Sequence, residues 1–235
     1  MSELVTSHLA SSIALDLYSP HPLLTDDNSS LVILILQGVE IDKAEYAAFA
    51  SELSQHQFWV IVPNCFPTGR DYLCPEESSV AQVFSSLKTS SDQSLGEALQ
   101  RGVILWGHSA GGMAAFGTLG ANSPEIAYPL VALMTYGSNA PPNSRIIKPL
   151  PPLLMLSGEQ DTIVPSAISR LAFEKISAPI KKFIELPGLN HYSINDSSQP
   201  QGSPQELRQA DCSNQDSIKL IASTLTSFIH TVVNK

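Results

Sequence analysis

The feature that most constrains this chain is a short apolar run, residues 103–106, that stops at a glycine. The chain continues Gly107-His108-Ser109-Ala110-Gly111, and residues 110–119 form a helix candidate. The pattern Gly-x-Ser-x-Gly between a strand and a helix predicts a sharp turn that strains the backbone at Ser109. Gly107 and Gly111 have no Cβ, so the strand and the helix can approach each other closely around this turn.

Strand and helix candidates alternate along the rest of the sequence. Residues 31–36 are apolar without alternation, which is typical of a strand buried on both faces of a parallel sheet. The other predicted strands are 12–17, 58–62, 103–106, 130–136, 153–156 and 182–186. The predicted helices are 43–55, 75–87, 110–119, 166–175 and 215–233. Alternation of this kind predicts an α/β fold, with a doubly wound, mostly parallel sheet flanked by helices in a single domain over residues 1–235.

Composition excludes several classes of function. Hydrophobic residues make up 43% of the 235 residues, so the chain can bury a core. The formal net charge is −9, which argues against a nucleic-acid partner and against an anionic membrane surface. No apolar run approaches the roughly 18 residues of a membrane span, so we expect no integral membrane segment.

The N-terminus and the cysteines indicate in which cellular compartment the protein is expected. Residues 1–8 lack a basic region followed by an apolar one, so no signal peptide is predicted. The cysteines are Cys65, Cys74 and Cys212, an odd number without a Cys-x-x-Cys pair. We expect mostly reduced thiols in a cytoplasmic protein, although a Cys65–Cys74 disulfide is geometrically possible.

The turn predicts a nucleophile, and a serine needs a base to take its proton. His108 is adjacent in sequence, but its side chain should point away from that of Ser109, so we interpret it as a packing residue. His191 is the better candidate, because it lies in a loop just past the strand 182–186 and can reach the carboxyl edge of the sheet. We interpret the remaining histidines as surface or packing residues; they are His8, His21, His56 and His230.

A third group must orient the histidine. Asp161 follows the strand 153–156, and the chain order Ser109, Asp161, His191 is that of nucleophile, acid and base in serine hydrolases of this topology. Its role would be to hold the imidazole tautomer and to stabilise the imidazolium. Glu159 is a neighbouring alternative that we expect to be exposed, and we expect Asp196 to be solvated.

Acyl transfer also needs preorganised N–H donors for an oxyanion. The backbone N–H of Ala110, the residue after Ser109, is one candidate. The second should come from the loop after the strand 31–36, which reads Gln37-Gly38-Val39, and we assign the N–H of Val39. Gly38 would free the backbone to turn. No metal ligand set and no cofactor motif is visible, so we expect neither a metal nor a cofactor.

The segments "GHSAGG", "SGEQDTIVP" and "GLNHYS" resemble, in this order, three anchors of the α/β-hydrolase superfamily. The resemblance runs over residues 31–233. The most similar branch joins dienelactone-hydrolase-like enzymes, chlorophyllase-like proteins and cutinase-type polyester hydrolases. "LSQHQFWVIVPN" resembles the third-strand segment of this branch, with Gln57 where a glycine is usual.

Three departures from the branch matter. Gln37 stands where the superfamily usually has histidine before the glycine of the oxyanion loop, so the support of that loop can differ. Plant chlorophyllases place an acid after the strand that follows the serine turn, whereas this chain reads Tyr136-Gly137-Ser138-Asn139 there. Dienelactone hydrolases use a cysteine, and Ser109 instead argues for ordinary esters.

Loop lengths bear on the substrate. Residues 137–152 number only 16 and include five prolines, too few for a helical cap domain. We therefore expect an open site, suited to bulky or amphiphilic esters, with walls from residues 63–73 and 191–214. The resemblance and the open site favour a serine carboxylesterase of chlorophyllase-like specificity, acting on the phytyl ester of a chlorophyll. The alternatives are a short-chain or lipid carboxylesterase, a non-catalytic ligand-binding protein of the same fold and, remotely, a metallohydrolase. The oligomeric state is not predicted.

Overall fold

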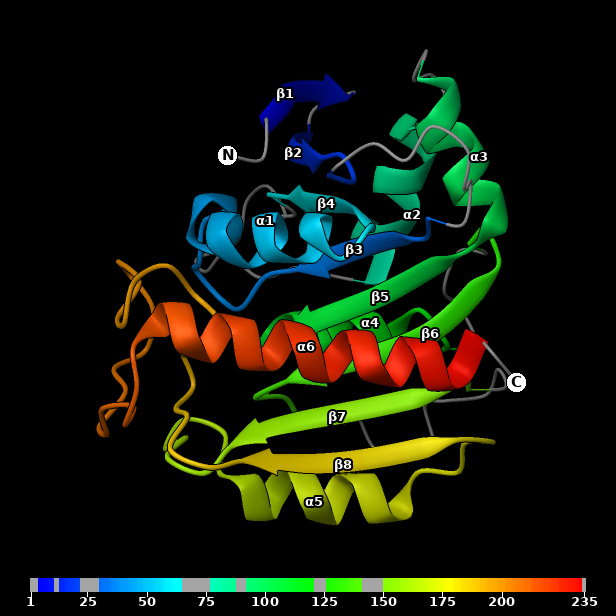
Figure 1. Cartoon of the computed structure of the whole chain (residues 1–235). Helices are drawn as coiled ribbons and strands as arrows, with labels where there is room; N and C mark the ends of the chain where they lie inside the picture. The colour runs from blue at the N-terminus through cyan, green and yellow to red at the C-terminus, as the bar shows by residue number, and fades with distance from the viewer. Residues whose placement is uncertain are drawn as a thin grey trace.

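The computed structural model describes residues 4–10, 13–21, 30–64, 77–87, 92–120, 126–140 and 150–233. The helices and strands follow one another along the chain as drawn in Figure 1. In order they are β1 (Leu4–Ala10), β2 (Ile13–Tyr18), β3 (Val32–Leu36), the 3-10 helix η1 (Lys43–Tyr46), α1 (Ala47–Gln55), β4 (Trp59–Pro63), α2 (Glu77–Leu87), α3 (Gln93–Arg101), β5 (Val103–His108), α4 (Ala110–Gly117), β6 (Leu130–Tyr136), β7 (Leu153–Gly158), α5 (Ser166–Lys175), β8 (Lys181–Leu186) and α6 (Asn214–Val233).

The strands form one sheet of eight in the order β1-β2-β4-β3-β5-β6-β7-β8. β1 and β2 pair antiparallel, as do β2 and β4, and all pairs from β4 to β8 are parallel. The strand order reverses at β3, which lies between β4 and β5. This is the doubly wound, mostly parallel sheet that the alternation of elements predicts.

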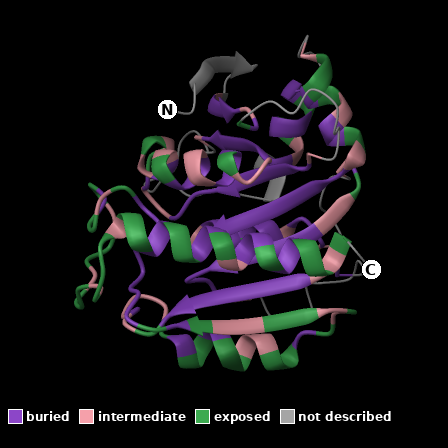
Figure 2. Cartoon of the chain, viewed as in Figure 1, coloured by how far each residue is buried: buried purple, intermediate pink, exposed green. Residues whose placement is uncertain are grey.

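Helices cover both faces of the sheet. One face packs on α1 and α6, through side chains such as Phe49, Leu53, Ile221 and Leu225. The opposite face packs on α2, α3 and α4, with Phe173 of α5 partly buried against the same cluster. Because both faces are covered, β3 and its neighbour β5 are fully buried, as Figure 2 shows. The apolar run 31–36 without alternation reflects this two-sided burial.

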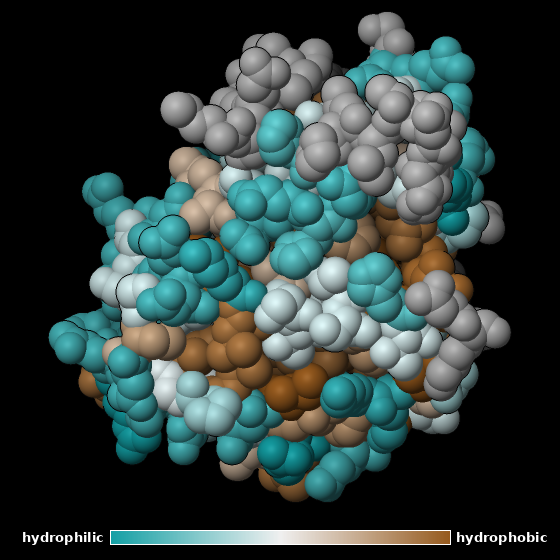
Figure 3. Space-filling view, in the orientation of Figure 1, coloured by the Kyte–Doolittle hydropathy of each residue, from teal (hydrophilic) through white to brown (hydrophobic). Residues whose placement is uncertain are grey.

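The long C-terminal helix shows how its sequence fixes its orientation. Its buried positions include Ile218, Ile221, Leu225 and Phe228, a spacing of three or four residues that forms one stripe facing the sheet. Figure 2 shows this as alternating buried and exposed bands along α6. Figure 3 shows apolar surface beside the helix on this face of the molecule. Among the described side chains that pack against the same core cluster, Ile180 and Ile184 are only partly buried.

Sequence and structure differ in three places. η1 replaces the first turn of the helix predicted at 43–55, with Asp42 accepting a hydrogen bond from the N–H of Ala44 at 2.8 Å. α3 was not predicted, because it is short and polar with only Leu95, Ala98 and Leu99 buried. β1 was not predicted either; it is an edge strand that pairs only with β2.

Some predictions concern residues outside the described ranges. These are Cys65 and Cys74 with their possible disulfide, most of the loop 63–73, and the start of the helix predicted at residue 75. In the connection from β6 to β7, the described residues 137–140 and 150–152 contain no helix. Of the helices that the structure describes, none has both the length and the apolarity that crossing a membrane requires.

Candidate active site

Ser109 lies at a strained turn between β5 and α4. Its φ of 53° and ψ of −120° are a combination that a residue with a Cβ rarely adopts. The turn is held by three hydrogen bonds: the N–H of Ser109 donates to the Tyr136 carbonyl at 3.0 Å, its carbonyl accepts from the N–H of Gly112 at 3.0 Å, and the same carbonyl accepts from the Ser138 hydroxyl at 2.7 Å. Hydrogen bonds with the end of β6 and with α4 therefore hold the backbone of Ser109 in this strained conformation.

The two glycines of the turn allow the close approach that the sequence predicts. A methyl group at Gly107 would lie 2.4 Å from the backbone of Gly112. One at Gly111 would lie 2.1 Å from the carbonyl oxygen of Leu36 and 2.5 Å from that of Gln37. The start of α4 is thus pressed against the carboxyl end of β3, where the candidate oxyanion loop begins.

Asp161 and His191 form a buried pair. Asp161 Oδ2 lies 2.8 Å from His191 Nδ1, and the two side chains are 0% and 2% exposed. The other carboxylate oxygen, Oδ1, accepts hydrogen bonds from the N–H groups of Ile163 at 3.0 Å and Val164 at 2.7 Å. Because the carboxylate only accepts, Nδ1 carries the proton and Nε2 is the nitrogen that can take another.

Gly137 connects this pair with the serine turn. It follows β6 directly after Tyr136, whose carbonyl binds the N–H of Ser109. A methyl group at Gly137 would lie 2.9 Å from His191 Nδ1 and 3.0 Å from Asp161 Oδ2. The backbone between the serine turn and the acid–base pair therefore has no room for a side chain. The three candidate residues, Ser109, Asp161 and His191, lie at the same edge of the sheet.

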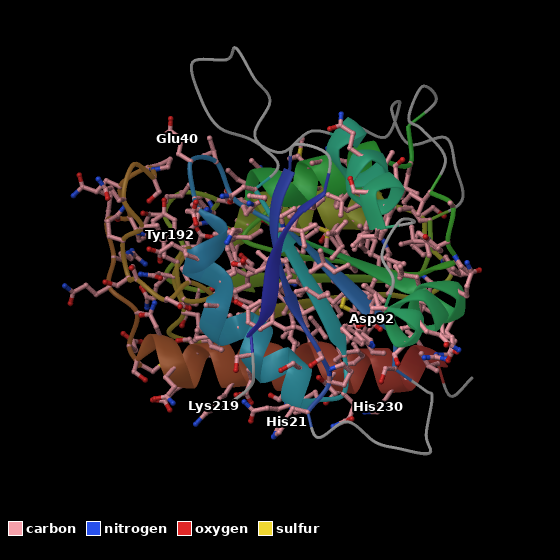
Figure 4. All side chains as sticks on the ribbon, turned by 90° about the horizontal axis from the view of Figure 1, so that it is seen from above. His21, Glu40, Asp92, Tyr192, Lys219 and His230 are labelled. Atoms are coloured by element: carbon pink, nitrogen blue, oxygen red, sulfur yellow. The ribbon has the colours of Figure 1, made fainter. Side chains whose placement is uncertain are left out.

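This edge is formed by the carboxyl ends of the parallel strands, which point the same way in Figure 1. Figure 4 places Glu40, which follows the candidate oxyanion loop, and Tyr192, which follows His191, at this end of the molecule. The labelled Asp92 and His230 lie at the opposite end. Loops at the carboxyl edge of an open α/β sheet are the usual place for a binding site.

His108 is completely buried beside this pair and does more than fill space. Its Nδ1 lies 2.8 Å from the Tyr46 hydroxyl and its Nε2 lies 3.0 Å from the His191 carbonyl oxygen. Its ring centroid is 4.8 Å from that of His191. Burial, with a smaller contribution from His191, holds the pKa of His108 well below its ordinary value, so the ring is neutral.

The candidate oxyanion loop packs directly on the turn. A methyl group at Gly38 would lie 3.4 Å from Ser109 Cβ and 3.2 Å from His108 Nδ1. The N–H of Gly38 donates to the Tyr46 hydroxyl at 2.8 Å and is therefore occupied. Val39 and Ala110, whose N–H groups are the two candidate donors, are partly exposed.

Gln37 holds this loop by a hydrogen bond to Asn64, the residue directly after β4. Its side chain is fully buried and its amide nitrogen donates to Asn64 Oδ1 at 3.0 Å. Asn64 Oδ1 also accepts from the N–H of Lys43 at 2.8 Å, and its amide nitrogen donates to Asp42 Oδ2 at 2.9 Å. The amide thus ties the loop to the segment that precedes η1.

The residues weighed against the candidate trio occupy other positions. Glu159 is exposed and accepts a hydrogen bond from the N–H of Gly188 at 3.0 Å. Asp196 is exposed and accepts from the N–H of Ala48 at the start of α1, at 3.0 Å. His56 pairs at 3.7 Å with Glu52 on the surface of α1, far along the chain from the turn.

Two contributing side chains were not singled out from the sequence. Tyr46 lies on η1 and contacts both Gly38 and His108. Glu206 lies in the loop 191–214, and its carboxylate accepts a hydrogen bond from the N–H of His191 at 3.1 Å. Neither belongs to a motif, and both are recognisable only once distant segments are brought together.

A surface cavity of about 690 Å³ opens on the loop between β8 and α6. Its lining residues lie between Asn190 and Asn214 and are mostly polar, Glu206 among them, and Ser109 does not line it. Within the described ranges, no group of three or more histidine, cysteine, aspartate or glutamate side chains is arranged to hold a metal ion.

Comparison with solved structures identifies the fold. Est1E from Butyrivibrio proteoclasticus is similar with a TM-score of 0.63 and 12% identity, over 99% of this chain and 100% of that one. An esterase from Thermogutta terrifontis, Est2 with butyrate bound, is similar with a TM-score of 0.62 and 17% identity, over 96% and 94% of the two chains. The same esterase phosphorylated by paraoxon gives a TM-score of 0.62 at 15% identity, over 97% and 93%.

The protein therefore has the α/β-hydrolase fold. At identities of 12–17% these similarities define the architecture only. No family model matches the sequence, and no curated protein does.

Proposed function

We propose that the protein is a serine carboxylic-ester hydrolase in a single α/β-hydrolase domain. The observation that carries the proposal is the buried Asp161–His191 pair, joined at 2.8 Å, at the same sheet edge as a serine held at a strained strand-to-helix turn. Strain at a residue with a Cβ is kept only where the surroundings impose it, and such positions cluster at functional sites. The structural neighbours include an esterase, which agrees with this chemistry.

In the proposed reaction Ser109 Oγ attacks the ester carbonyl while His191 Nε2 takes the serine proton. The tetrahedral intermediate collapses as His191 returns that proton to the leaving alcohol, and an acyl-enzyme remains. A water molecule, deprotonated by the same nitrogen, then attacks the acyl-enzyme and releases the acid. Asp161 holds the tautomer with the proton on Nδ1 and stabilises the imidazolium.

The negative oxygen of the intermediate would be bound by the backbone N–H groups of Val39 and Ala110. The Ala110 N–H lies at the start of α4, where the helix dipole also favours negative charge. The supporting side chain of the loop is Gln37 rather than histidine, but a backbone donor depends on loop position, which the Gln37–Asn64 contact holds. The proposed chemistry uses side chains, backbone groups and water, without a cofactor, in a cytoplasmic protein.

For the natural substrate we propose a bulky, amphiphilic ester, with the phytyl ester of chlorophyll as the specific candidate. Support comes from the sequence resemblance to the chlorophyllase-like branch and from a β6–β7 connection of 16 residues that is too short for a cap domain. The alternative is a short-chain or lipid ester; the esterase from Thermogutta terrifontis has been seen with butyrate and with propionate bound.

A labelling experiment tests the reaction class. A fluorophosphonate probe should label wild-type protein at Ser109 and should not label Ser109→Ala, because the probe needs an activated serine. Failure of the folded wild-type protein to react would favour the non-catalytic, ligand-binding alternative and would overturn the proposed function.

A substrate panel tests specificity. The purified protein should be assayed with short and long p-nitrophenyl esters, chlorophyll a and a polyester. Release of phytol from chlorophyll a would support the specific proposal, whereas activity confined to short esters would overturn it and leave the ester hydrolase assignment in place.

A further inference from the structure

Glu206 contacts the proposed base from a distant part of the loop that joins β8 to α6. Its Oε2 accepts a hydrogen bond from the backbone N–H of His191 at 3.1 Å, across 15 residues of sequence. We propose that Glu206 is a positioning residue. It holds His191 together with the acid loop, residues 159–165, which joins β7 to α5 and contains Asp161. This inference rests on the proposed function, in which His191 and Asp161 act as base and acid.

The same carboxylate also holds the acid loop. The N–H of Thr162, the residue directly after Asp161, lies 3.3 Å from both carboxylate oxygens of Glu206. The Thr162 hydroxyl donates to Oε1 as well. The Glu206 side chain therefore links Thr162, the residue after the proposed acid, with His191, the proposed base. A shift of the loop that carries either residue would strain the same set of hydrogen bonds.

The carboxylate is fixed in turn by its own segment. Its Oε1 accepts from the N–H of Leu207 at 2.8 Å and from that of Arg208 at 3.2 Å. Burial by itself would raise the pKa of Glu206, but the hydrogen bonds from Thr162, His191 and Arg208 outweigh it and hold the pKa below its ordinary value. Near neutral pH the side chain is therefore an anion, which can only accept hydrogen bonds.

His191 is consequently held at three points by three different segments. Asp161 binds its ring at Nδ1, Glu206 binds its N–H, and His108 binds its carbonyl at 3.0 Å. The first contact sets the tautomer, and the other two set where the ring lies relative to Ser109. Proton transfer in the proposed reaction depends on that position, because displacement by about 1 Å can cost roughly 100-fold in rate.

Glu45 provides a matched control. It anchors the same loop, since its Oε2 accepts from the N–H of Ser197 and its Oε1 from the Ser197 hydroxyl, both at 2.9 Å. Among the described contacts, its carboxylate reaches neither His191 nor Thr162. Loss of Glu45 should therefore loosen the loop at Ser197 without releasing the acid–base pair.

The first test needs no substrate. The Nδ1 proton of His191 should give a protected, low-field NMR resonance, assigned by its loss in His191→Ala. We expect this proton to exchange with solvent about 10-fold faster or more in Glu206→Ala, and at the wild-type rate in Glu45→Ala. Equal exchange in wild-type protein and folded Glu206→Ala would overturn the proposal, as would absence of the resonance from the wild type.

A nearly isosteric variant covers the case in which Glu206→Ala does not fold. Glu206→Gln keeps one oxygen acceptor and replaces the other with a donor that faces N–H groups. We expect exchange of the His191 Nδ1 proton to be about 3- to 10-fold faster in this variant. A wild-type rate in Glu206→Gln would then count against the proposal.

Kinetics give an independent readout. With p-nitrophenyl acetate we expect kcat of Glu206→Ala to fall about 10- to 100-fold while KM changes by less than about threefold, and Glu206→Gln to recover part of kcat. An equal loss of kcat in Glu45→Ala would overturn the positioning role, because mere loosening of the loop would then explain it. Wild-type protein that hydrolyses no ester contradicts the proposed function, whereas the exchange measurement still decides the positioning proposal.

Discussion

His108 Nε2 lies 3.0 Å from the backbone carbonyl oxygen of His191, and this contact fixes the state of a completely buried imidazole. Because a carbonyl oxygen only accepts, Nε2 carries the proton and Nδ1 accepts from the Tyr46 hydroxyl at 2.8 Å. The Tyr46 oxygen accepts in turn from the N–H of Gly38. A chain of three hydrogen bonds thus joins the candidate oxyanion loop to the backbone of the candidate base.

The first prediction separates the proposed base, His191, from the buried hydrogen-bond chain through Tyr46. His191→Ala should lower ester turnover of the folded protein by roughly 10³-fold or more, because it removes the proposed proton acceptor. Tyr46→Phe should instead destabilise the fold by about 1–3 kcal/mol, because it leaves the Gly38 N–H and His108 Nδ1 buried without their partner. Steady-state kinetics and urea unfolding of both variants check this. Unchanged turnover in folded His191→Ala would contradict the assignment of the base.

The second prediction concerns the close contact behind the serine turn. Gly111→Ala would place a methyl group 2.1 Å from the Leu36 carbonyl oxygen, so we expect it to destabilise the fold by about 3 kcal/mol or more. Gly96 is a matched control within α3, where a methyl group meets nothing within 4 Å. Gly96→Ala should stabilise the protein by about 0.5–1 kcal/mol, and denaturant melts of the two variants should shift in opposite directions.

The fold was largely predictable because its signals are local. Runs such as residues 31–36 are apolar on both faces only in a covered parallel sheet, and the pattern of α6 records a single buried stripe. The elements that escaped prediction have weak patterns of this kind: β1 pairs along one edge only, and α3 buries three side chains. Tertiary packing, and not local propensity, forms them.

The candidate site was predictable only in part. Chain order was sufficient to select Asp161 and His191, and the structure places their side chains 2.8 Å apart, while their catalytic role stays a prediction. The side chains of Tyr46, His108 and Glu206 make contacts between segments far apart in sequence, which no local motif records. The sequence predicts the loop 191–214 only as a wall of the site, and gives no sign that Glu45 and Glu206 bind its backbone N–H groups.

The third prediction concerns Gln57. In the third-strand segment that this part of the sequence resembles, a glycine is usual at its position. Gln57 has a φ of 69°, the left-handed conformation that glycine adopts without strain, just after the end of α1. Gln57→Gly should therefore stabilise the protein by about 0.5–1 kcal/mol, even though it loses the side-chain hydrogen bond to the His21 carbonyl. A lower free energy of unfolding in this variant than in wild type would show that this contact outweighs the strain.

The fourth prediction is a dependence of stability on pH. Burial keeps the pKa of His108 well below 6.5 in the folded protein, whereas in the unfolded chain the ring titrates near that value. Below about pH 6.5 the unfolded state therefore binds a proton that the folded state does not, and the free energy of unfolding falls as pH decreases. For one group the slope approaches about 1.4 kcal/mol per pH unit.

His108→Asn tests this assignment, because asparagine keeps polar atoms close to where the imidazole nitrogens lie but does not titrate. Urea unfolding between pH 7.5 and pH 5 should show a smaller loss of stability on acidification in the variant than in wild type. Carboxylates such as Glu206, whose pKa lies below its ordinary value, lose their contribution only at lower pH, below about 4.5. Identical slopes above pH 5 in the two proteins would mean that His108 is not the group responsible.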